Sequence, residues 1–292
     1  LFGQLAFQQA LFILLLAPEF YLPFRQLGAH YHAGLAGVDA AERIDALLVA
    51  APDRTTVAGT KDWLLQKPPA IAFNNVSFSY SADRPPALRN ISFSVAPGEQ
   101  VALIGPSGSG KSTLFDLLLK FIHPDSGEIL IDGHCLSSLP TEKWRNCIAY
   151  VPQFPHLFQG TLRDNISFGA TPSPGQVEQA AARAGLENWI EQLPAGYDTA
   201  IGEGGRGLSG GEAKRIAIAR AFFRDAPLLL LDEAMTALDP RNENAIQQEI
   251  RELQKNRTVL MIAHRKSTAR SADRIIALHD GQLIEAGEFM PC

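Results

Sequence analysis

A glycine-rich octapeptide limits the possible folds of this chain more than any other stretch. Residues 105–112 have the sequence GPSGSGKS, which matches the pattern G-x-x-x-x-G-K-[ST] in full. An apolar run at residues 101–104 precedes it, and a helical pattern at residues 111–121 follows it. In this setting the glycines let backbone N–H groups face phosphate oxygens, and the helix N-terminus adds positive potential. The octapeptide therefore predicts a phosphate-binding loop between a strand and a helix.

Two residues of this loop carry its charge chemistry. Lys111 is expected to neutralise the β- and γ-phosphates of a nucleotide, and the Ser112 hydroxyl is expected to bind Mg²⁺. The other residues expected around the phosphates are Gly105, Pro106, Ser107, Gly108, Ser109, Gly110 and Thr113. A chance glycine–serine turn is the alternative, and the flanking strand and helix argue against it.

The second signal is an apolar run that ends in two acids. Residues 228–231 are all leucine, and Asp232 and Glu233 follow them. Ligands of open α/β sheets bind beyond the carboxyl ends of the strands. Asp232 is therefore expected to hold Mg²⁺ through water, and Glu233 to polarise an attacking water molecule. Taken alone, the pair reads equally well as a solvated acidic turn.

A second glycine-rich segment separates this chain from kinases, GTPases and helicases. It runs from Leu208 to Glu212 and places Ser209 23 positions before Asp232. Ser209 can cap the following helix, while Gly210 and Gly211 expose backbone N–H groups. An ordinary capped helix start is the alternative. Two copies arranged head to tail would use both anion sites, with each ATP held between Lys111 of one chain and Ser209 of the other.

From residue 71 onward, short apolar or alternating runs are interleaved with helical patterns. The runs predict strands at residues 71–80, 91–95, 101–104, 129–131, 148–151, 228–231, 259–262 and 275–278. The helical patterns predict helices at residues 111–121, 174–184, 210–224, 243–255 and 266–271. Uniformly apolar strands suit a parallel sheet that is covered on both faces.

In this order and spacing, the motifs resemble the nucleotide-binding domain of ATP-binding-cassette (ABC) transporters over about residues 71–287. The resemblance implies an α/β fold, the P-loop NTPase ABC cassette. This cassette has a RecA-like parallel sheet core, an antiparallel β subdomain and an α-helical signature subdomain. It also implies ATP and Mg²⁺ as cofactors and an ATPase whose catalytic residues are Glu233, His264 and Lys111.

Four further positions resemble functional residues of that family. Tyr80 resembles the aromatic residue that stacks on adenine, and Gln153 the glutamine that contacts Mg²⁺ and senses the membrane domain. Asp239 resembles the loop residue that touches the opposing site, and His264 the histidine that bonds the γ-phosphate. Residues 202–207 resemble the exporter loop that couples to the membrane helices. Each position taken singly has an ordinary structural explanation.

Two positions depart from the family pattern. Glu212 stands where glutamine is commonest, and residues 234–236, with the sequence AMT, replace a usual Pro-Thr-Ser. Neither departure removes a group that hydrolysis requires, so the site is expected to be competent.

The chain begins with an apolar segment of a different kind. Residues 5–24 contain no Lys or Arg, and about 20 helical residues span the roughly 30 Å of a bilayer core. Arg25 and Arg43 follow the segment, which puts its C-terminal side in the cytoplasm. Pro18 and Pro23 are expected to bend or end the helix. A buried helix of a soluble domain is the alternative.

Three parts are therefore expected along the chain. Residues 1–51 hold the last transmembrane helix of an all-α membrane domain and its cytoplasmic extension, which is helical over residues 28–51. Residues 52–70 are a linker, and residues 71–292 form the cassette. Because the first residue is Leu1 and the family usually continues beyond Cys292, we interpret the chain as a fragment.

The N-terminal segment also bears on the cargo. It resembles the last transmembrane helix of exporter-type ABC half-transporters. Residues 16–28 and 40–44 look most like the CydD-type subunit of the heterodimeric thiol exporter. That exporter moves cysteine and glutathione across the bacterial inner membrane and supports cytochrome bd assembly. The resemblance implies a second half-transporter, CydC-like, as partner, and a cytoplasmic cassette. A multidrug, lipid or peptide exporter is the alternative.

Composition argues against other classes. With 26 Lys and Arg against 31 Asp and Glu, the net charge of −5 disfavours nucleic-acid binding. The three cysteines form no C-x-x-C pair and predict neither disulfides nor zinc. A non-transport ABC ATPase of DNA metabolism would carry a long coiled coil between loop and signature. The 104 positions from Gly105 to Ser209 hold no sustained heptad run.

Overall fold

The computed structural model describes residues 7–50, 65, 67–81, 83–202, 207–233, 243–263 and 266–284. The chain separates into two compact units, Leu1–Thr56 and Val57–Cys292. Asp239, His264 and residues 203–206 and 234–236, which the sequence singles out, lie outside the described residues.

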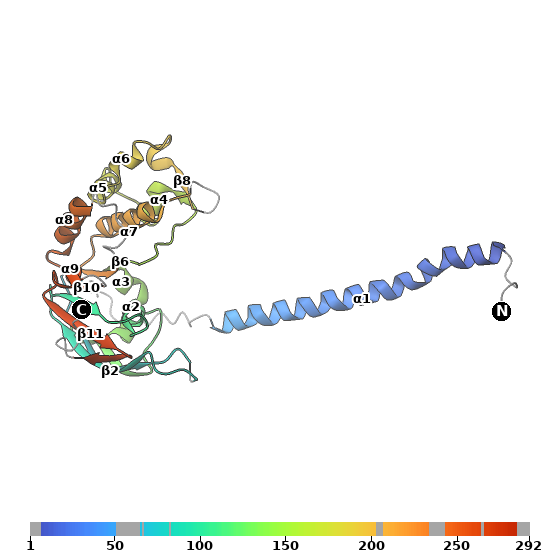
Figure 1. The fold of residues 1–292 in the computed structure, drawn as a ribbon, viewed down its shortest axis with the longest axis horizontal. Coiled ribbons are helices and arrows are strands. Elements are labelled where there is room, and N and C mark those ends of the chain that lie inside the picture. The colour runs from blue at the N-terminus through green and yellow to red at the C-terminus, as the bar shows by residue number, and fades with distance from the viewer. Residues whose placement is uncertain are drawn as a thin grey trace. The chain divides into compact units, whose positions relative to one another are not determined.

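The first unit holds one helix, α1, which runs from Phe7 to Ala50. Pro18 and Pro23 both lie inside it, so the prolines do not end the helix, and its two predicted stretches form one element. Its axis bends in the N-terminal half, the half that contains both prolines (Figure 1). A bend relieves the clash between a proline ring and the preceding turn, which lets the helix continue.

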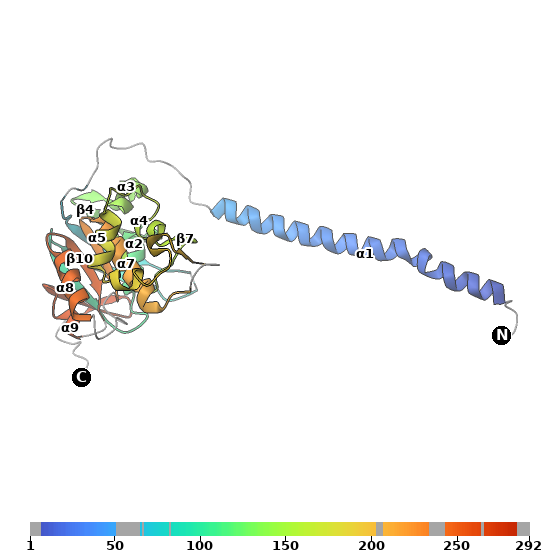
Figure 2. The same cartoon turned by 90° about the horizontal axis from the view of Figure 1, so that it is seen from above.

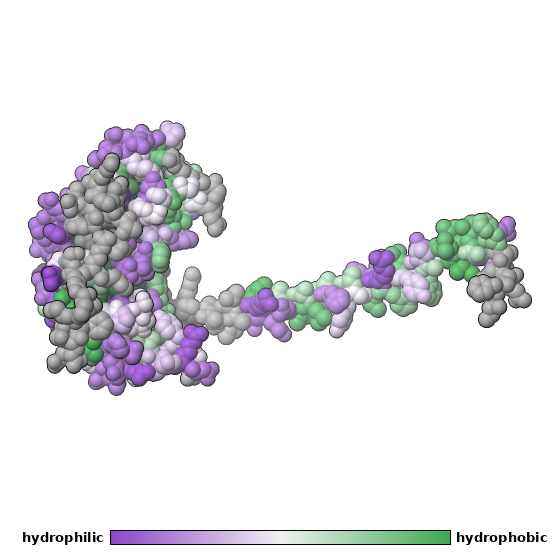
Figure 3. Space-filling model, viewed as in Figure 1, coloured by the Kyte–Doolittle hydropathy of each residue, from purple (hydrophilic) through white to green (hydrophobic). Residues whose placement is uncertain are grey.

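Among the described residues, one helix is long and apolar enough to cross a membrane, judged by length and composition. It covers Phe7–Asp45, and none of its most apolar stretch is buried. Large apolar side chains such as Phe12 and Leu14 are mostly exposed. Figure 3 shows apolar residues gathered at the N-terminal end of the helix and polar residues more frequent toward its C-terminal end.

The second unit is built on a six-stranded sheet with the order β12-β11-β3-β10-β9-β6. The bounds are β3 Gln100–Ile104, β6 Ile148–Val151, β9 Leu228–Asp232, β10 Thr258–Ile262, β11 Arg274–His279 and β12 Gln282–Ile284. Strands β11, β3, β10, β9 and β6 are parallel to their neighbours in this order, and β12 pairs antiparallel with β11. This is the parallel core that the apolar runs predict.

Both faces of this sheet are covered. Leu228 and Leu230 of β9 pack into one apolar core, and Leu229 and Leu231 pack into another. All five residues of β9 are buried, because alternate side chains point to opposite faces and each face has its own cover. The all-leucine run is thus explained by burial on two sides.

One face is covered by helix α2 (Lys111–Leu118) and by an antiparallel sheet with the order β2-β1-β4-β5. The bounds of its strands are β1 Ile71–Phe78, β2 Leu88–Val95, β4 Ser126–Ile131 and β5 His134–Cys135. Phe73 and Phe93 stack between β1 and β2 with ring centroids 4.6 Å apart. Helix α3 (Thr141–Asn146) adds the buried Trp144 to the same core.

The other face is covered by helices. Helices α4 (Leu162–Ser167), α5 (Gln176–Arg183) and α7 (Gly210–Arg224) pack on one another, and α7 also contacts β6. The remaining elements are α6 (Glu187–Ile190), α8 (Glu243–Gln254), α9 (Lys266–Ala269), the short strands β7 (Gly160–Thr161) and β8 (Ala200–Ile201), and two 3₁₀ turns at Leu136–Ser138 and Gly196–Asp198. Figure 2 shows the helices beside the sheets. The parallel core, the antiparallel sheet and the helical part are the three divisions that the sequence predicts.

Candidate nucleotide-binding site

The predicted site residues meet at the carboxyl edge of the parallel sheet. In the register of the strands, Asp232 at the end of β9 lies beside Ile262 of β10, and Val151 of β6 lies beside Leu231. The phosphate loop leaves the end of β3, the strand next to β10. Parallel strands end at one edge of a sheet, so segments far apart in the sequence share that edge.

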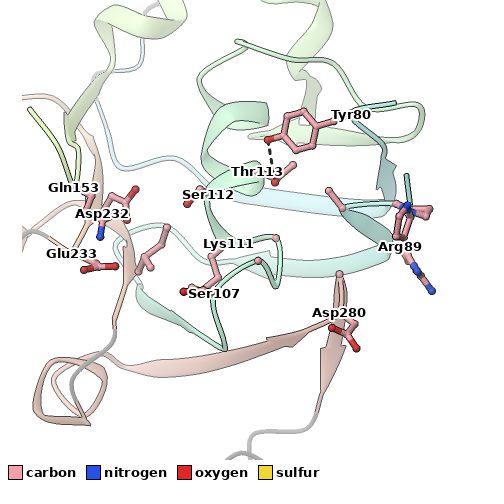
Figure 4. A pocket seen from close by; sticks show the side chains of 17 residues that line it. Tyr80, Arg89, Ser107, Lys111, Ser112, Thr113, Gln153, Asp232, Glu233 and Asp280 are labelled. Atoms are coloured by element: carbon pink, nitrogen blue, oxygen red, sulfur yellow. Dashed lines mark hydrogen bonds between the residues drawn. The ribbon is translucent and has the colours of Figure 1, made fainter. Parts of the chain in front are cut away.

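These segments enclose a cleft of about 690 Å³, within the size range of ligand pockets. Its lining includes the predicted residues Tyr80, Ser107, Gly108, Gly110, Lys111, Ser112, Thr113, Gln153, Asp232 and Glu233. Figure 4 shows the loop residues Ser107 and Lys111 between the acids Asp232 and Glu233 on one side and Tyr80 on the other.

Two loop glycines are required by close packing. A Cβ atom on Gly105 would lie 2.1 Å from the carbonyl oxygen of Leu278 in β11, and one on Gly110 would lie 2.6 Å from that of Ala87. Both residues also have positive φ, +147° and +101°. The loop is therefore wedged between the end of β11 and the start of β2, and only glycine fits at these two points.

The N-terminus of α2 is open toward the cleft. Its N-cap is Gly110, which has no side chain to accept a bond from the first turn. The N–H groups of Lys111, Ser112 and Thr113 have no acceptor inside the helix, because the first turn never provides one. These donors and the positive end of the helix dipole form a place for an anion.

Lys111 is only 6% exposed. Its ammonium donates to the carbonyl oxygens of Gly105 and Pro106, at 3.0 and 2.8 Å, and to the Ser109 hydroxyl at 3.2 Å. Burial lowers the pKa of Lys111, and the charges of Asp232 and Glu233 oppose that effect. The loop thus folds around a buried cation at the centre of the cleft. A glycine cradle, a buried ammonium and an acid pair together fit a polyphosphate with a divalent cation.

The acid pair is held by the sheet and by α7. Asp232 is 8% exposed at the end of β9. Glu233 has φ of +47°, a left-handed conformation that costs a residue with a side chain about 1–3 kcal/mol. Its N–H donates to the carbonyl oxygen of Ile262 at 3.3 Å, and its own carbonyl oxygen accepts a bond from the Lys214 ammonium.

Tyr80 lies at the rim of the cleft and is 58% exposed. Its ring packs edge-on against Phe78, with centroids 4.9 Å apart, and its hydroxyl is 3.3 Å from that of Thr113. The hydroxyl also donates to Asp116 at 3.4 Å. Burial raises the pKa of Asp116, and this hydrogen bond opposes that effect. The anchored ring keeps exposed surface on which a base can stack.

The signature segment lies elsewhere. Ser209 caps α7: its hydroxyl accepts from the Glu212 N–H at 3.3 Å, and the Glu212 carboxylate accepts from the Ser209 N–H at 2.7 Å. This reciprocal capping box explains how a glutamate serves at a position where the family favours glutamine. Within the described residues, Ser209, Gly210 and Gly211 do not line the cleft of their own chain.

Part of the cleft is lined by residues outside the predicted motifs. Its lining also includes Pro85–Ala87, Arg89, Asp280 and Gly281. The Gly281 N–H donates to the carbonyl oxygen of Ser109, and the Arg89 N–H donates to that of Gly281, at 3.3 and 2.7 Å. The dipeptide Asp280-Gly281 is a recognisable turn signal. Its packing on the phosphate loop is a contact between residues far apart in the sequence, and no local pattern predicts it.

Comparison with known proteins identifies the family. The sequence profile described as "ABC transporter" matches residues 88–236, about half of the chain. The chain therefore belongs to the ABC transporter family, and its cassette fold is the one that the motifs predict.

Individual relatives are exporters by name. The chain is 49% identical over 219 residues to the "ATP-dependent lipid A-core flippase" of Escherichia coli strain K12 and to that of Shigella flexneri. Each alignment covers 74% of this chain and 38% of the relative, so the chain spans about two fifths of the length of these relatives. A solved structure of "a bacterial Atm1-family ABC exporter with ATP bound" is 37% identical, has a TM-score of 0.77, and is matched over 97% of this chain and 49% of its own.

These relatives refine the predicted class. They support an exporter-type ABC protein and fit the lipid-exporter alternative better than thiol export. None of the relatives compared above carries a thiol exporter's name, so the CydD-type resemblance rests on residues 16–28 and 40–44 alone.

Proposed function

We propose that this chain is the ATP-hydrolysing subunit of an exporter in the bacterial inner membrane, with its cassette on the cytoplasmic side. One observation carries the proposal. The phosphate loop, Gln153 and the acid pair converge on one cleft, in a chain whose first helix is apolar and long enough to cross a bilayer. Cleft and helix together favour a membrane transporter over a soluble ATPase.

Each residue has a part in this proposal. The N–H groups at the start of α2 and Lys111 hold the phosphates, and Tyr80 stacks on the base. Ser112, Gln153 and Asp232 hold Mg²⁺, directly or through water. Glu233 orients the attacking water. Bound Mg·ATP supplies the phosphoryl group that is transferred. His264 and Asp239 remain predictions from the sequence.

A second half-transporter completes the site. Among the described residues, the Ser209–Gly211 segment does not line its own cleft, and the capping box leaves the N–H groups of Gly210 and Gly211 open to a nucleotide held by a partner cassette. ATP binding then closes two cassettes head to tail and turns the membrane domains outward, and hydrolysis resets them. The partner is a CydC-like subunit if the cargo is a thiol.

Two cargo classes have specific support. A lipid is favoured by the flippase relatives, at 49% identity. A small thiol, cysteine or glutathione, is favoured by residues 16–28 and 40–44, which lie in α1. Residues 16–24 of this stretch lie in the predicted membrane span, where helices contact cargo, whereas the cassette contacts nucleotide.

The test is an ATPase assay on the full-length protein, reconstituted with its partner in lipid nanodiscs. Lipid A-core added to the bilayer raises turnover if the cargo is a lipid, and reduced glutathione or cysteine raises it if the cargo is a thiol. Lys111→Ala is the inactive control. A protein that hydrolyses no ATP, or that leaves the membrane on a salt wash, refutes the exporter proposal.

A further inference from the structure

Lys214 is a buried lysine to which the predicted roles give no part. It lies in α7, the helix that Ser209 caps, and it is only 4% exposed. Lysine is rarely buried to this degree unless its ammonium has partners. Its partners are therefore a guide to what it does.

The ammonium of Lys214 points to the end of β9. It donates a hydrogen bond to the main-chain carbonyl oxygen of Glu233. Burial lowers the pKa of Lys214, and the charges of Glu233 and Asp232 oppose that effect. Burial and the charges of the same two acids also act on the pKa of Lys111. One acid pair therefore interacts with two buried lysines, one from the phosphate loop and one from α7.

Glu233 needs support at this point of its backbone. Its φ of +47° lies in the left-handed region, which side-chain-bearing residues adopt only when their surroundings hold them there. Two hydrogen bonds do so: the Glu233 N–H donates to Ile262, and the Glu233 carbonyl accepts from Lys214. The first bond comes from the sheet, and the second comes from a separate element, α7.

We propose that Lys214 is a positioning residue for hydrolysis, whose bond to the Glu233 carbonyl holds this glutamate where its carboxylate faces the attacking water. The contact also links the nucleotide cleft of this chain to α7, the helix whose N-terminus is proposed to meet the partner's nucleotide. Because Lys214 and Ser209 share one helix, a shift of that helix on contact with the partner's nucleotide moves Glu233 as well. This inference rests on the ATPase function proposed above.

The experiment compares Lys214→Met with a matched control, Lys255→Met, in the full-length protein with its partner. Methionine keeps the apolar stem and removes the donor and the charge. Lys255 is an exposed lysine paired with Glu252 on the surface. Hydrogen–deuterium exchange of residues 228–233 is measured without nucleotide. Then kcat, the KM for ATP and the melting temperature are measured.

Lys214→Met is expected to speed exchange at Glu233 and to lower kcat about tenfold or more, with KM changed less than about twofold. Lys255→Met is expected to match the wild type in all four quantities. The proposal is overturned if Lys214→Met keeps the wild-type kcat or leaves exchange at Glu233 unchanged. It is also overturned if kcat, KM and melting temperature all deteriorate together, which would indicate a packing role.

A second variant guards against misfolding. Lys214→Gln keeps an N–H donor without the charge and is expected to protect Glu233 from exchange better than Lys214→Met does. Equal exchange in the two variants would overturn the proposal. Failure of the ATPase function itself is distinguishable, because the wild type would then hydrolyse no ATP while the nucleotide-free exchange measurement still reports on Lys214.

Discussion

Helices α2 and α7 both begin in a glycine-rich turn, and both N-termini are predicted to meet phosphate, yet they are built differently. The N-cap of α2 is Gly110, which offers the first turn no acceptor. The N-cap of α7 is Ser209, which forms a capping box with Glu212. The start of α2 lines a cleft in its own chain, and the start of α7 does not.

The difference shows which anion site gathers its parts within one chain. At α2 the open donors, the buried Lys111 and the acid pair lie together around one cleft. At α7 the capping box uses the N–H groups of Ser209 and Glu212. Those of Gly210 and Gly211 stay outside the box and are the ones left for an anion from elsewhere. The Glu212 carboxylate beside them accepts from the Ser209 N–H and interacts favourably with the positive end of the helix dipole.

The largest effect is expected at Glu233, which accepts a hydrogen bond from Lys214 of α7 and whose charge acts on Lys111 of α2. Glu233→Gln removes the base that orients water and keeps the shape of the side chain. It is expected to cut turnover by about 10²–10⁴-fold while ATP still binds and holds the cassettes closed. Steady-state hydrolysis and size-exclusion chromatography with ATP measure the two effects. Unchanged turnover would contradict the role given to Glu233.

The next effect separates the α2 site from the α7 site. Lys111→Ala removes the only predicted cation among the loop residues 105–113 and is expected to weaken ATP binding about 10–150-fold, the value of a hydrogen bond to a charged group. Titration with a fluorescent ATP analogue gives the dissociation constant. Normal binding would show that the α2 site does not depend on Lys111.

A matched pair of glycine variants tests the comparison directly. Gly110→Ala meets a positive φ and a carbonyl 2.6 Å away and is expected to lower the free energy of unfolding by about 2 kcal/mol or more. Gly210→Ala meets nothing within 4 Å and is expected to leave it unchanged or slightly raised. Urea denaturation measures both.

Gly210→Ala then has a second use. Its methyl group would stand between the start of α7 and a partner's phosphate, so ATPase activity of the assembled exporter is expected to fall although the fold is intact. Full activity of this variant would mean that no phosphate approaches α7.

The smallest effect is expected at the cap of α7. Ser209→Ala removes a capping hydroxyl and is expected to cost about 1 kcal/mol of stability. ATP affinity of the cleft in the same chain is expected to stay unchanged, because Ser209 does not line it. Denaturation and nucleotide titration of one sample test both statements. A change in that affinity would place Ser209 closer to its own nucleotide than the structure does.

Much of the site is predictable because its parts are local. A strand, a glycine loop and a helix follow one another between Gln100 and Leu118. The geometry of the phosphate loop therefore depends on one short stretch of sequence. The all-leucine strand β9 places Asp232 at its end by the same short-range logic. Short elements were missed: β7, β8, α4 and α6 have two to six residues each, too few for a hydrophobic period. Helix α4 did carry a signal, the capping box of Thr161 and Asp164.

The prolines show a different limit. Pro18 and Pro23 predict a bend or an end, and local chemistry does not choose between them. The structure keeps one helix of 44 residues.

By itself, the sequence determined the chemistry of this protein: the phosphate loop, the acid pair, the second glycine-rich helix start and the apolar first helix. These features depend on neighbours in the chain, and residue type and spacing are enough to define them. Only the tertiary structure decided which pieces meet. Gly281 packs on the phosphate loop, and Lys214 bonds to Glu233 across 19 positions of sequence. Such contacts follow from sheet order and helix packing, which are set by the burial of many side chains at once and not by any local pattern.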